Sequence, residues 1–459
     1  MVELKGKKAL VVGLGRTGVP AALRLMRLGA AVTVTDRNPA EKLKDDLAKL
    51  PVVVSREIGS HERVINEEFD LVVTSPGVPW ESPLLAAMRA SGAEVISEIE
   101  LAFRLAKRDW VAITGTNGKS TTTALVGAMM NESKLESVVC GNIGNAVIGE
   151  DAVFERDVRV VAEISSFQLE GVTEFKPRVS AILNITQDHL DRHGTMEEYI
   201  RLKCRVFDLQ RGNDVCVLNL DDEEAAKLVE RAPCRVFPFS AQRVLKEGVF
   251  ANNGRIVIVH NSESWSVGDA KDLKIVGRAN LENALAACAI AFSAGADVAA
   301  ITRALFRFEA LPHRLELVAE TAGVKYVNDS KGTNVGSTLK ALDGMDGHVV
   351  VILGGLDKGS DYAPLADLVK RKKASVILIG EAADKIGAAL AGYADVVRAA
   401  SMEESVRIAA ARACRGDTVL LSPACASFDM FRDYLDRGDK FRQAVKNLSA
   451  NGGANAQKA

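Results

Sequence analysis

The sequence predicts an α/β protein with three domains: an N-terminal Rossmann-like domain, a central domain of the P-loop ATPase type and a C-terminal Rossmann-like domain. A glycine-rich turn joins a strand to a helix near the start of the chain. A second strand–loop–helix unit carries GTNGKST from residue 115, and strands and helices alternate again after about residue 311. We expect domains at 1–98, 99–310 and 311–448, and a disordered tail at 449–459.

The composition is that of a globular protein and argues against several classes. The chain has 459 residues, 26% of them charged, and a net charge of -2, which argues against general nucleic-acid binding. No apolar run reaches the roughly 18 to 20 residues that span a membrane, and the N-terminus has no secretory signal pattern. The seven cysteines form no CxxC pair. We therefore expect no membrane insertion, no zinc site, no disulfides and a reducing cytoplasm.

The first glycine-rich turn lies between a predicted strand at 8–12 and a predicted helix at 18–28, and a second strand at 31–35 leads to Asp36. The turn, GLGRTG, has the G-x-G-x-x-G spacing of a nucleotide fingerprint, with an acidic residue near the expected distance. It indicates a dinucleotide or another ligand with a pyrophosphate. The alternative is tight packing of the helix on the sheet without a ligand. After a further strand at 71–74, SPGVP forms a fixed turn at a carboxyl end, where α/β proteins bind ligands.

A buried strand at 110–114, a glycine-punctuated loop and a helix at 120–130 form the second unit. Backbone N–H groups and the positive end of the helix dipole would face an anion there. Lys119 would neutralise a terminal phosphate, and a hydroxyl at Ser120 or Thr121 would hold Mg²⁺. The spacing is not the ordinary Walker pattern, which has its first glycine five residues before Gly118. The alternative is an ordinary strand–turn–helix with a surface lysine.

Polar residues follow the next strands of the central segment. The strand at 158–164 carries Glu163 near its end, which is either a Mg²⁺ ligand beside the phosphate loop or an exposed carboxylate. The strand at 179–184 leads into a polar stretch with two histidines, of which we favour His189 as a ligand and expect His193 to be structural.

A charged helix at 195–209 carries Lys203, which on local grounds alone would be a solvated lysine. Residues 235–276 predict a small antiparallel sheet, with turns at 252–254 and 267–268. In the last third of the chain, strand signals recur, each followed by a polar or glycine-containing turn. These predicted strands are 324–328, 348–353, 374–379 and 418–421.

Two further polar groups stand out. Asn280 and Asn283 are three residues apart on a predicted helix at 280–294, so they share a face. They would either hydrogen-bond a base or cap and pack within the protein. The stretch DSKGTN at 329–334 follows a strand and offers a carboxylate, a cation and a hydroxyl in one turn.

Six motifs taken together resemble the Mur ligase family, and their order and spacing extend from Gly13 to about Phe441. They are TGTNGKST, EISSFQLE, NITQDHLDRHG, LPHRLE, NDSKGTNVGST and LLSPACASFDMF. The resemblance implies three α/β domains that bind a UDP-sugar, ATP and the incoming amino acid. Within the family, GLGRTG and SPACASFDMF favour the ligation of D-glutamate to UDP-N-acetylmuramoyl-L-alanine, by a cytoplasmic monomer that uses ATP and two Mg²⁺ ions.

The resemblance also implies roles for individual residues. The catalytic residues would be Lys119, Glu163, His189 and a carbamylated Lys203, and the metal ligands would be Ser120, Glu163, His189 and Lys203. The ATP site would comprise Gly115, Thr116, Asn117, Gly118, Lys119, Ser120, Thr121, Asn280, Asn283, His313, Arg314 and Asp329. The UDP-substrate would contact Leu14, Thr17, Asp36, Gly77, Asn142 and His189. D-Glutamate would contact Lys331, Thr333, Lys358, Ser427, Phe428 and Tyr434.

Two positions depart from the family pattern. Asn38 stands where an arginine is often found, and Gly332 stands where alanine is common, a difference that we expect to be minor. The implied chemistry is phosphorylation of a carboxylate by ATP and attack of an amine on the acyl phosphate, with closure of the third domain as ATP binds. The alternatives are a folylpolyglutamate synthase-like ligase, an NAD-dependent oxidoreductase suggested by GLGRTG, and a P-loop switch or motor protein.

Overall fold

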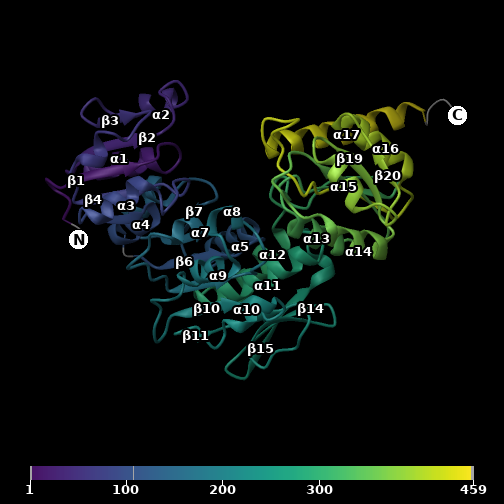
Figure 1. The fold of residues 1–459 in the computed structure, drawn as a ribbon. Helices are drawn as coiled ribbons and strands as arrows, with labels where there is room; N and C mark the ends of the chain where they lie inside the picture. The colour runs from purple at the N-terminus through teal and green to yellow at the C-terminus, as the bar shows by residue number, and fades with distance from the viewer. Residues whose placement is uncertain (1–2, 107, 456–459) are drawn as a thin grey trace. The chain divides into compact units, whose positions relative to one another are not determined.

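The computed structural model describes residues 3–106 and 108–455. They form two compact units, whose elements are labelled in Figure 1. The first unit contains the residues up to Val267 together with Leu285–Ala304, and the second contains Gly268–Ala284 together with the residues from Leu305 onward. Both units are built on sheets with helices packed against them, so the predicted α/β class is confirmed.

The N-terminal sheet of the first unit is parallel, as the βαβ pattern predicts. Its elements are β1 (Lys8–Val12), α1 (Gly18–Arg27), β2 (Ala31–Asp36), α2 (Lys44–Ala48), β3 (Ser55–Ile58), η1 (Val64–Asn66), β4 (Leu71–Thr74), α3 (Pro83–Ala90), β5 (Glu94–Ser97) and α4 (Glu98–Leu105). The strand order is β3-β2-β1-β4-β5. Because successive side chains of a strand alternate between faces, Val11 packs with α1 and α4, whereas Leu10 packs with α3. Helices on both faces make this domain Rossmann-like.

The central sheet of the first unit is also parallel. Its elements are β6 (Trp110–Thr114), α5 (Lys119–Glu132), β7 (Ser137–Gly141), η2 (Val147–Gly149), α6 (Asp151–Glu155), β8 (Arg159–Glu163), α7 (Ser166–Leu169), β9 (Val179–Ile182), α8 (Leu190–His193), α9 (Met196–Cys204), β10 (Val215–Leu218), α10 (Glu223–Lys227) and β11 (Arg235–Val236). The strand order β11-β10-β9-β6-β8-β7 places β6 between β9 and β8. The segments that follow these three strands therefore meet at one edge of the sheet.

A four-stranded sheet with the order β12-β13-β14-β15 follows. Its elements and the next helices are β12 (Phe239–Ser240), β13 (Gly248–Asn252), β14 (Arg255–His260), β15 (Glu263–Asp269), η3 (Ala270–Asp272), α11 (Arg278–Ser293) and α12 (Val298–Arg307). The sheet is mixed, since β12 pairs parallel with β13. The predicted turn at 252–254 is confirmed, but the one at 267–268 is wrong because both residues lie inside β15. Gly268 permits a close approach, since a Cβ there would lie 2.5 Å from the Phe306 ring.

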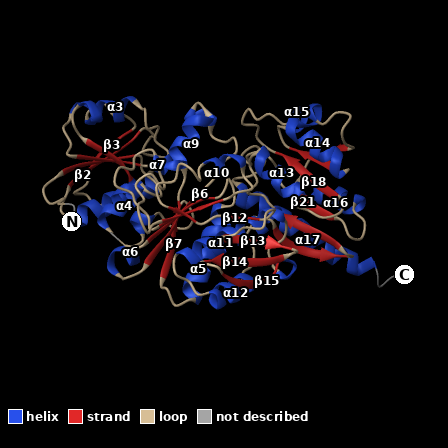
Figure 2. Ribbon diagram, turned by 90° about the horizontal axis from the view of Figure 1, so that it is seen from below, coloured by secondary structure: helices blue, strands red, loops and turns tan. Residues whose placement is uncertain are grey.

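The sheet of the second unit has the order β16-β17-β21-β18-β19-β20 and is parallel except for the β16–β17 pair. Its elements are β16 (Glu316–Thr321), β17 (Val324–Asn328), α13 (Val335–Asp343), β18 (Val349–Gly354), α14 (Ala363–Lys372), β19 (Ser375–Ile379), α15 (Ala383–Ala389), β20 (Val396–Arg398), α16 (Met402–Arg412), β21 (Thr418–Leu421) and α17 (Tyr434–Asn455). Val351 packs with α13, α14 and α15, whereas Ile352 packs with α16 and α17. Figure 2 shows these helices around strands β18 and β21 of the sheet. This is the second Rossmann-like domain.

Two predicted ends differ from the structure. The helix expected at 195–209 ends at Cys204, after which the amides of Arg205, Val206 and Phe207 bond to carbonyls three residues back, so the chain turns. The tail expected from residue 449 begins inside α17, which extends to Asn455, and the rest of the expected tail, 456–459, lies outside the described residues. Within the described part of the chain, no helix has the length and hydropathy needed to cross a bilayer.

Candidate active site

The loop between β6 and α5 has the backbone of a phosphate cradle. Gly118 precedes the helix with a φ of 85°, and Gly115 has a φ of 150°, conformations that side chains disfavour. A Cβ on Gly115 would lie 3.1 Å from the Leu183 Cβ, so glycine also lets the loop pack against the end of β9. The predicted strand–loop–helix is confirmed, with the helix starting at Lys119, and its N-terminal amides are suited to an anion.

Asn184 holds the loop in place, a role that the sequence motifs do not indicate. Its side-chain Oδ1 accepts from the Asn117 amide at 2.8 Å, and its Nδ2 donates to the Asn117 carbonyl at 3.0 Å. The Thr116 amide donates to the Asn184 carbonyl at 2.9 Å, and the Thr116 hydroxyl donates to the Thr186 carbonyl at 3.1 Å. Asn184 could have been identified from its position, because it is a polar residue at the end of a strand that neighbours β6.

Lys119 begins α5 and folds back over the loop. Its ammonium donates to the carbonyls of Gly115 and Thr116, each at 2.9 Å. The ammonium is thereby kept beside the loop amides. A phosphate group bound there would face a full positive charge in addition to the partial positive charges of the amides. Thr121, the other predicted loop residue, is buried on the same helix.

Ser120 and Glu163 lie in direct contact, which the sequence alone could not establish. The Ser120 hydroxyl donates to Glu163 Oε2, and the Asn142 side chain donates to Glu163 Oε1 at 2.8 Å. Glu163 is 2% exposed, so it is not the solvated strand-end carboxylate that was the alternative. A hydroxyl and a carboxylate oxygen beside a phosphate cradle fit Mg²⁺, which takes few protein ligands and completes its shell with phosphate and water.

Lys203 is buried at 1% exposure and is not a solvated helix lysine. Its ammonium donates to the Gly115 carbonyl at 2.9 Å and lies 4.4 Å from the centre of the Tyr199 ring. Burial, followed by the nearby charge of Lys119, lowers the pKa of Lys203 well below its ordinary value of 10.5. The neutral amine is therefore favoured here, and only a neutral amine can add CO₂ to form a carbamate.

The two histidines differ in their surroundings, and the ligand role of His189 stays a prediction. His193 is buried, its Nε2 lies 3.0 Å from the Ser166 hydroxyl, and its ring stacks on Tyr199. Burial lowers the pKa of His193 to about 4, which suits a neutral, structural residue. His189 has a φ of 54° and a half-exposed side chain, and the positive charges of Lys119 and Lys203 act on it. Burial is the main reason that the pKa of His189 is lowered, and the charges of Lys119 and Lys203 lower it further.

The GLGRTG turn is closed by hydrogen bonds from side chains. The Leu14 amide donates to Asp36 Oδ2 at 2.8 Å, and both nitrogens of Asn38 donate to Asp36 Oδ1. The Thr17 hydroxyl donates to the Ser75 hydroxyl at 2.9 Å. Asn38, which departs from the family pattern, thus holds Asp36 in place.

Residues near this turn also connect it to the central sheet. Gly77, in the SPGVP turn, has no atom within 4 Å of the position of a Cβ, so this position is open. Arg16, whose role the GLGRTG pattern does not indicate, donates to the carbonyls of Gly141 and Gly144 at 3.1 and 3.2 Å. Since Asn142 lies between these two glycines, Arg16 joins the turn to the segment that contacts Glu163.

The remaining residues predicted for ATP belong to the second unit. Asn280 and Asn283 are buried on one face of α11, where the Asn283 amide donates to Asn280 Oδ1 at 3.1 Å. Asp329 is 8% exposed and accepts from the Ser422 hydroxyl, and burial raises the pKa of Asp329 to about 7. Arg314 is half-buried, and its charge acts on Asp329.

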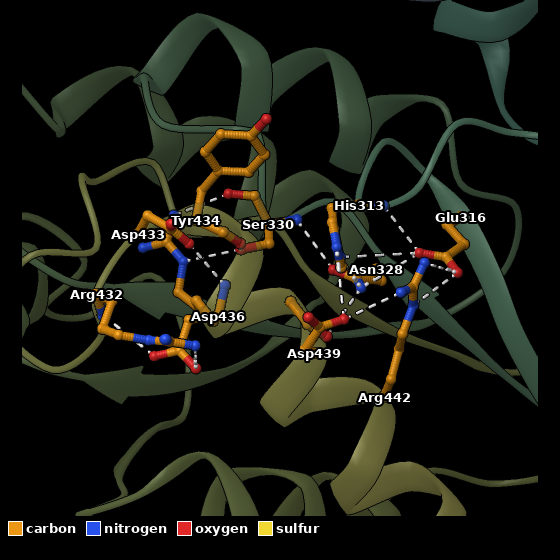
Figure 3. Close-up of polar contacts among 12 residues, drawn as sticks. His313, Glu316, Asn328, Ser330, Arg432, Asp433, Tyr434, Asp436, Asp439 and Arg442 are labelled. Atoms are coloured by element: carbon orange, nitrogen blue, oxygen red, sulfur yellow. Dashed lines mark hydrogen bonds and ion pairs between the residues drawn. The ribbon is translucent and has the colours of Figure 1, made fainter. Parts of the chain in front are cut away.

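His313 lies in a buried polar network, drawn in Figure 3. Its Nδ1 lies 3.0 Å from the Asn328 side-chain nitrogen, and its amide donates to Glu316 at 2.8 Å. A Cβ on Gly438 would lie 2.1 Å from His313 Nδ1, so only glycine fits against the ring. The structure gives this histidine a packing role, and the predicted contact with the nucleotide stays a prediction.

The residues predicted for D-glutamate lie on neighbouring loops at the carboxyl edge of the second unit's sheet, except Tyr434, which begins α17. Leu356 and Ala426 exchange two backbone hydrogen bonds of 3.0 and 3.2 Å, so the loops that carry Lys358 and Ser427 run side by side. Ser427 is 2% exposed, whereas Phe428 is 68% exposed.

The loop after β17 joins this group from the other side. Lys331 places its ammonium 3.9 Å from the centre of the Tyr434 ring. Thr333, half-buried, follows in the same loop, where its amide donates to the Lys331 carbonyl at 2.8 Å. The Gly332 carbonyl accepts from the Ala424 amide at 3.0 Å, which fixes this loop against the segment after β21.

Comparison with known proteins agrees with this geometry. Family models described as "Mur ligase MurD-like, N-terminal domain", "Mur ligase middle domain" and "Mur ligase, glutamate ligase domain" match residues 7–97, 113–291 and 313–425. The UDP-N-acetylmuramoylalanine–D-glutamate ligase of Geotalea daltonii is 47% identical, over 98% of this chain and 99% of that protein. The chain belongs to the Mur ligase family. The ligase of the same name from Geobacter metallireducens is also 47% identical, over 97% and 99% of the two chains.

Solved structures of Mur ligases share the fold at low sequence identity. A pseudomurein peptide ligase type C from Methanothermus fervidus matches with a TM-score of 0.60 and 20% identity, over 96% of this chain and all of that one. This comparison supports the architecture of three α/β domains. The N-terminal and C-terminal Rossmann-like parts and the central P-loop part are therefore confirmed as a fold class.

Proposed function

We propose that this Mur ligase joins D-glutamate to UDP-N-acetylmuramoyl-L-alanine, with hydrolysis of ATP to ADP and phosphate, in the cytoplasmic synthesis of peptidoglycan precursors. The observation that carries the proposal is the contact between Ser120 and Glu163 beside a phosphate loop in a chain 47% identical to ligases of that name. The proposed domain ranges are 1–98 for the UDP-sugar, 99–310 for ATP and 311–448 for D-glutamate. We propose that the protein acts as a monomer.

The first step that the chain must assist is phosphorylation of a carboxylate. A carboxylate and a triphosphate repel each other, so cations must hold them together. Lys119 supplies a fixed cation beside the loop amides, since its ammonium is held by the carbonyls of Gly115 and Thr116. Mg²⁺, bound by Ser120 and Glu163 in this proposal, would neutralise further charge on the phosphates.

Lys203 and His189 are proposed to serve a second Mg²⁺. A lysine ammonium cannot bind a metal ion, whereas a carbamate offers anionic oxygens. The buried amine of Lys203, with its lowered pKa, is suited to that modification. His189, half-exposed and near both lysines, would add a nitrogen ligand at the same place.

In the second step, the amine of D-glutamate attacks the acyl phosphate, and phosphate leaves as the amide forms. The amine must arrive uncharged, while the two carboxylates of D-glutamate need cations. Lys331 and Lys358 are proposed to bind these carboxylates, with the Ser427 hydroxyl as a further donor. Phe428, Thr333 and Tyr434 would line the same site.

The experiment that tests the function is a phosphate-release assay with ATP, Mg²⁺ and UDP-N-acetylmuramoyl-L-alanine, run with and without D-glutamate. Turnover that depends on D-glutamate, with formation of the UDP-linked dipeptide, is the expected result. Release of phosphate without an acceptor would favour a nucleotide-hydrolysing switch. Turnover with a folate substrate and glutamate would favour the folylpolyglutamate synthase-like alternative.

A further inference from the structure

We propose that Arg437 is the positioning residue of the amino-acid site: its guanidinium fixes the two loops that carry Lys331 and Ser427. This inference rests on the proposed function, since it concerns the site for D-glutamate. Arg437 lies in the first turn of α17 and is 0% exposed, so it cannot itself contact a ligand in solvent.

The guanidinium makes four hydrogen bonds, and all of them reach these two loops. Its Nε donates to the Ser330 hydroxyl at 3.0 Å, and its Nη2 donates to the Ser330 carbonyl at 2.8 Å. Its Nη1 donates to the carbonyls of Cys425 and Ala426 at 3.1 and 3.0 Å. The loop after β17 and the loop after β21 are thus joined through one side chain.

Two further contacts extend this junction to the other predicted residues. The Ser330 hydroxyl donates to the Tyr434 carbonyl at 2.8 Å, and the Tyr434 ring lies beneath the Lys331 ammonium (Figure 3 shows Ser330 beside Tyr434). A Cβ on Gly355 would lie 3.1 Å from Arg437 Nη1, so the loop that leads to Lys358 also passes directly over the guanidinium.

The charge of Arg437 indicates a role beyond filling space in the protein interior. Among the described residues it forms no direct ion pair, and its hydrogen bonds go to carbonyl and hydroxyl oxygens, while the charges of Asp429 and Asp329 favour the cation from further away. Burial lowers its pKa to about 10, which leaves it protonated at neutral pH. Burying an unpaired charge is unfavourable, and an apolar side chain would fill the same space at lower cost. Only the planar guanidinium offers donors in several fixed directions at once.

The hydrogen bonds also set the direction of the backbone where the ligand would bind. The Ala426 carbonyl accepts from Arg437 and from the Leu356 amide. Because a trans peptide points its N–H opposite to its carbonyl, the Ser427 amide faces away from the guanidinium. Arg437 therefore fixes the direction of the Ser427 amide, which points to the side of the loop opposite the guanidinium.

The test compares Arg437→Lys with the wild-type enzyme in steady-state kinetics. Lysine keeps the charge but cannot replace four directed hydrogen bonds, so the KM for D-glutamate should rise roughly 10-fold or more. The KM values for ATP and UDP-N-acetylmuramoyl-L-alanine should rise by a smaller factor, since of the residues on these two loops only Asp329 is predicted to contact ATP. Ser330→Ala removes one hydroxyl, which accepts from Arg437 and donates to the Tyr434 carbonyl, and leaves the guanidinium, so it should raise the KM for D-glutamate by a smaller factor.

Arg104→Lys is the matched control. Arg104 is a buried arginine of the first unit that pairs with Glu100, so its replacement should lower the melting temperature and leave the KM for D-glutamate unchanged. An Arg437→Lys enzyme that behaves like this control would overturn the proposal. If Arg437→Lys does not fold, an unchanged KM in Ser330→Ala overturns it instead. A wild-type enzyme without D-glutamate-dependent turnover would refute the proposed function, which is a separate result.

Discussion

Lys119 and Lys203 donate to the same oxygen, the carbonyl of Gly115, each at 2.9 Å. Two ammonium groups on one oxygen must repel each other. Burial of Lys203 favours its neutral amine, which removes this repulsion. Burial and the charge of Lys119 lower the pKa of Lys203, whereas Lys119 is half-buried at the start of α5. One lysine is thus placed to act as a cation and the other as a neutral amine.

Lys119→Ala should abolish turnover and leave the fold intact. The ammonium is the only side-chain cation that the phosphate loop itself provides. Loss of one positive charge that stabilises the phosphates in phosphoryl transfer should slow the reaction by on the order of 10³-fold or more. The measurement is kcat in the phosphate-release assay, with circular dichroism to confirm folding. Activity close to that of the wild type in a folded variant would contradict the assignment of the ATP site.

Lys203→Ala should be almost inactive, and formate or acetate should restore part of its rate. The small acid would supply the anionic oxygens that a carbamate on Lys203 would provide, in the space left by the side chain. Lys227→Ala, which removes an exposed helix lysine paired with Glu223 and Glu224, is the control and should neither lose activity nor respond to acids. Full activity of Lys203→Ala would mean that this lysine is structural.

Glu98→Gln should change the pH dependence of stability. Glu98 is fully buried at the start of α4, and burial raises its pKa to about 7. The folded state therefore binds an extra proton between the unfolded pKa of about 4.3 and that value, so the stability from this group is present at low pH and is lost as pH rises toward 7. Relative to that of Glu98→Gln, the free energy of unfolding of the wild type should fall by on the order of 2 to 4 kcal/mol between about pH 4 and pH 8.

Melting temperatures at several pH values would measure this effect. Glu62→Gln, at an exposed position of the same domain, provides the comparison and should follow the wild-type curve. Parallel curves for the wild type and Glu98→Gln would show that Glu98 has no raised pKa in the folded protein.

The strands, the phosphate loop and the Rossmann-like turns were predictable because each is a local pattern. Asn184 was not, since it supports Asn117 from 67 residues away and becomes relevant only when β9 is known to lie beside β6. Arg437 was missed for the same reason, because its partners lie on two other loops. Contacts of this kind depend on strand order, which periodicity does not specify.

Gly332 shows a second limit of the sequence pattern. Its departure from alanine was expected to be minor, but a Cβ there would lie 2.5 Å from Asp329 Oδ2 and 2.8 Å from the Ser422 hydroxyl. Glycine thus leaves room for the hydrogen bond between Asp329 and Ser422. The motif shows which residue is unusual, whereas only the packing shows what the change permits.

Lys358→Ala and Ser427→Ala should raise the KM for D-glutamate far more than those for ATP or the UDP-sugar. The two residues lie on loops paired through Leu356 and Ala426, at the sheet edge where α/β proteins bind ligands. A hydrogen bond to a charged group contributes roughly 1.5 to 3 kcal/mol, so each KM should rise about 10- to 150-fold.

The same geometry predicts the choice of acceptor, because a second carboxylate needs a second cation. D-Glutamate can use both Lys331 and Lys358, whereas D-alanine has one carboxylate and leaves one lysine without a ligand partner, so D-glutamate should be strongly preferred. Lys358→Ala should therefore reduce the preference for D-glutamate over D-alanine, since it weakens the binding of D-glutamate and leaves the binding of D-alanine nearly unchanged. Lys370→Ala, at an exposed position of α14, is the control and should keep the wild-type preference. Equal use of D-alanine by the wild type, or an unchanged D-glutamate KM in both variants, would place the acceptor site elsewhere.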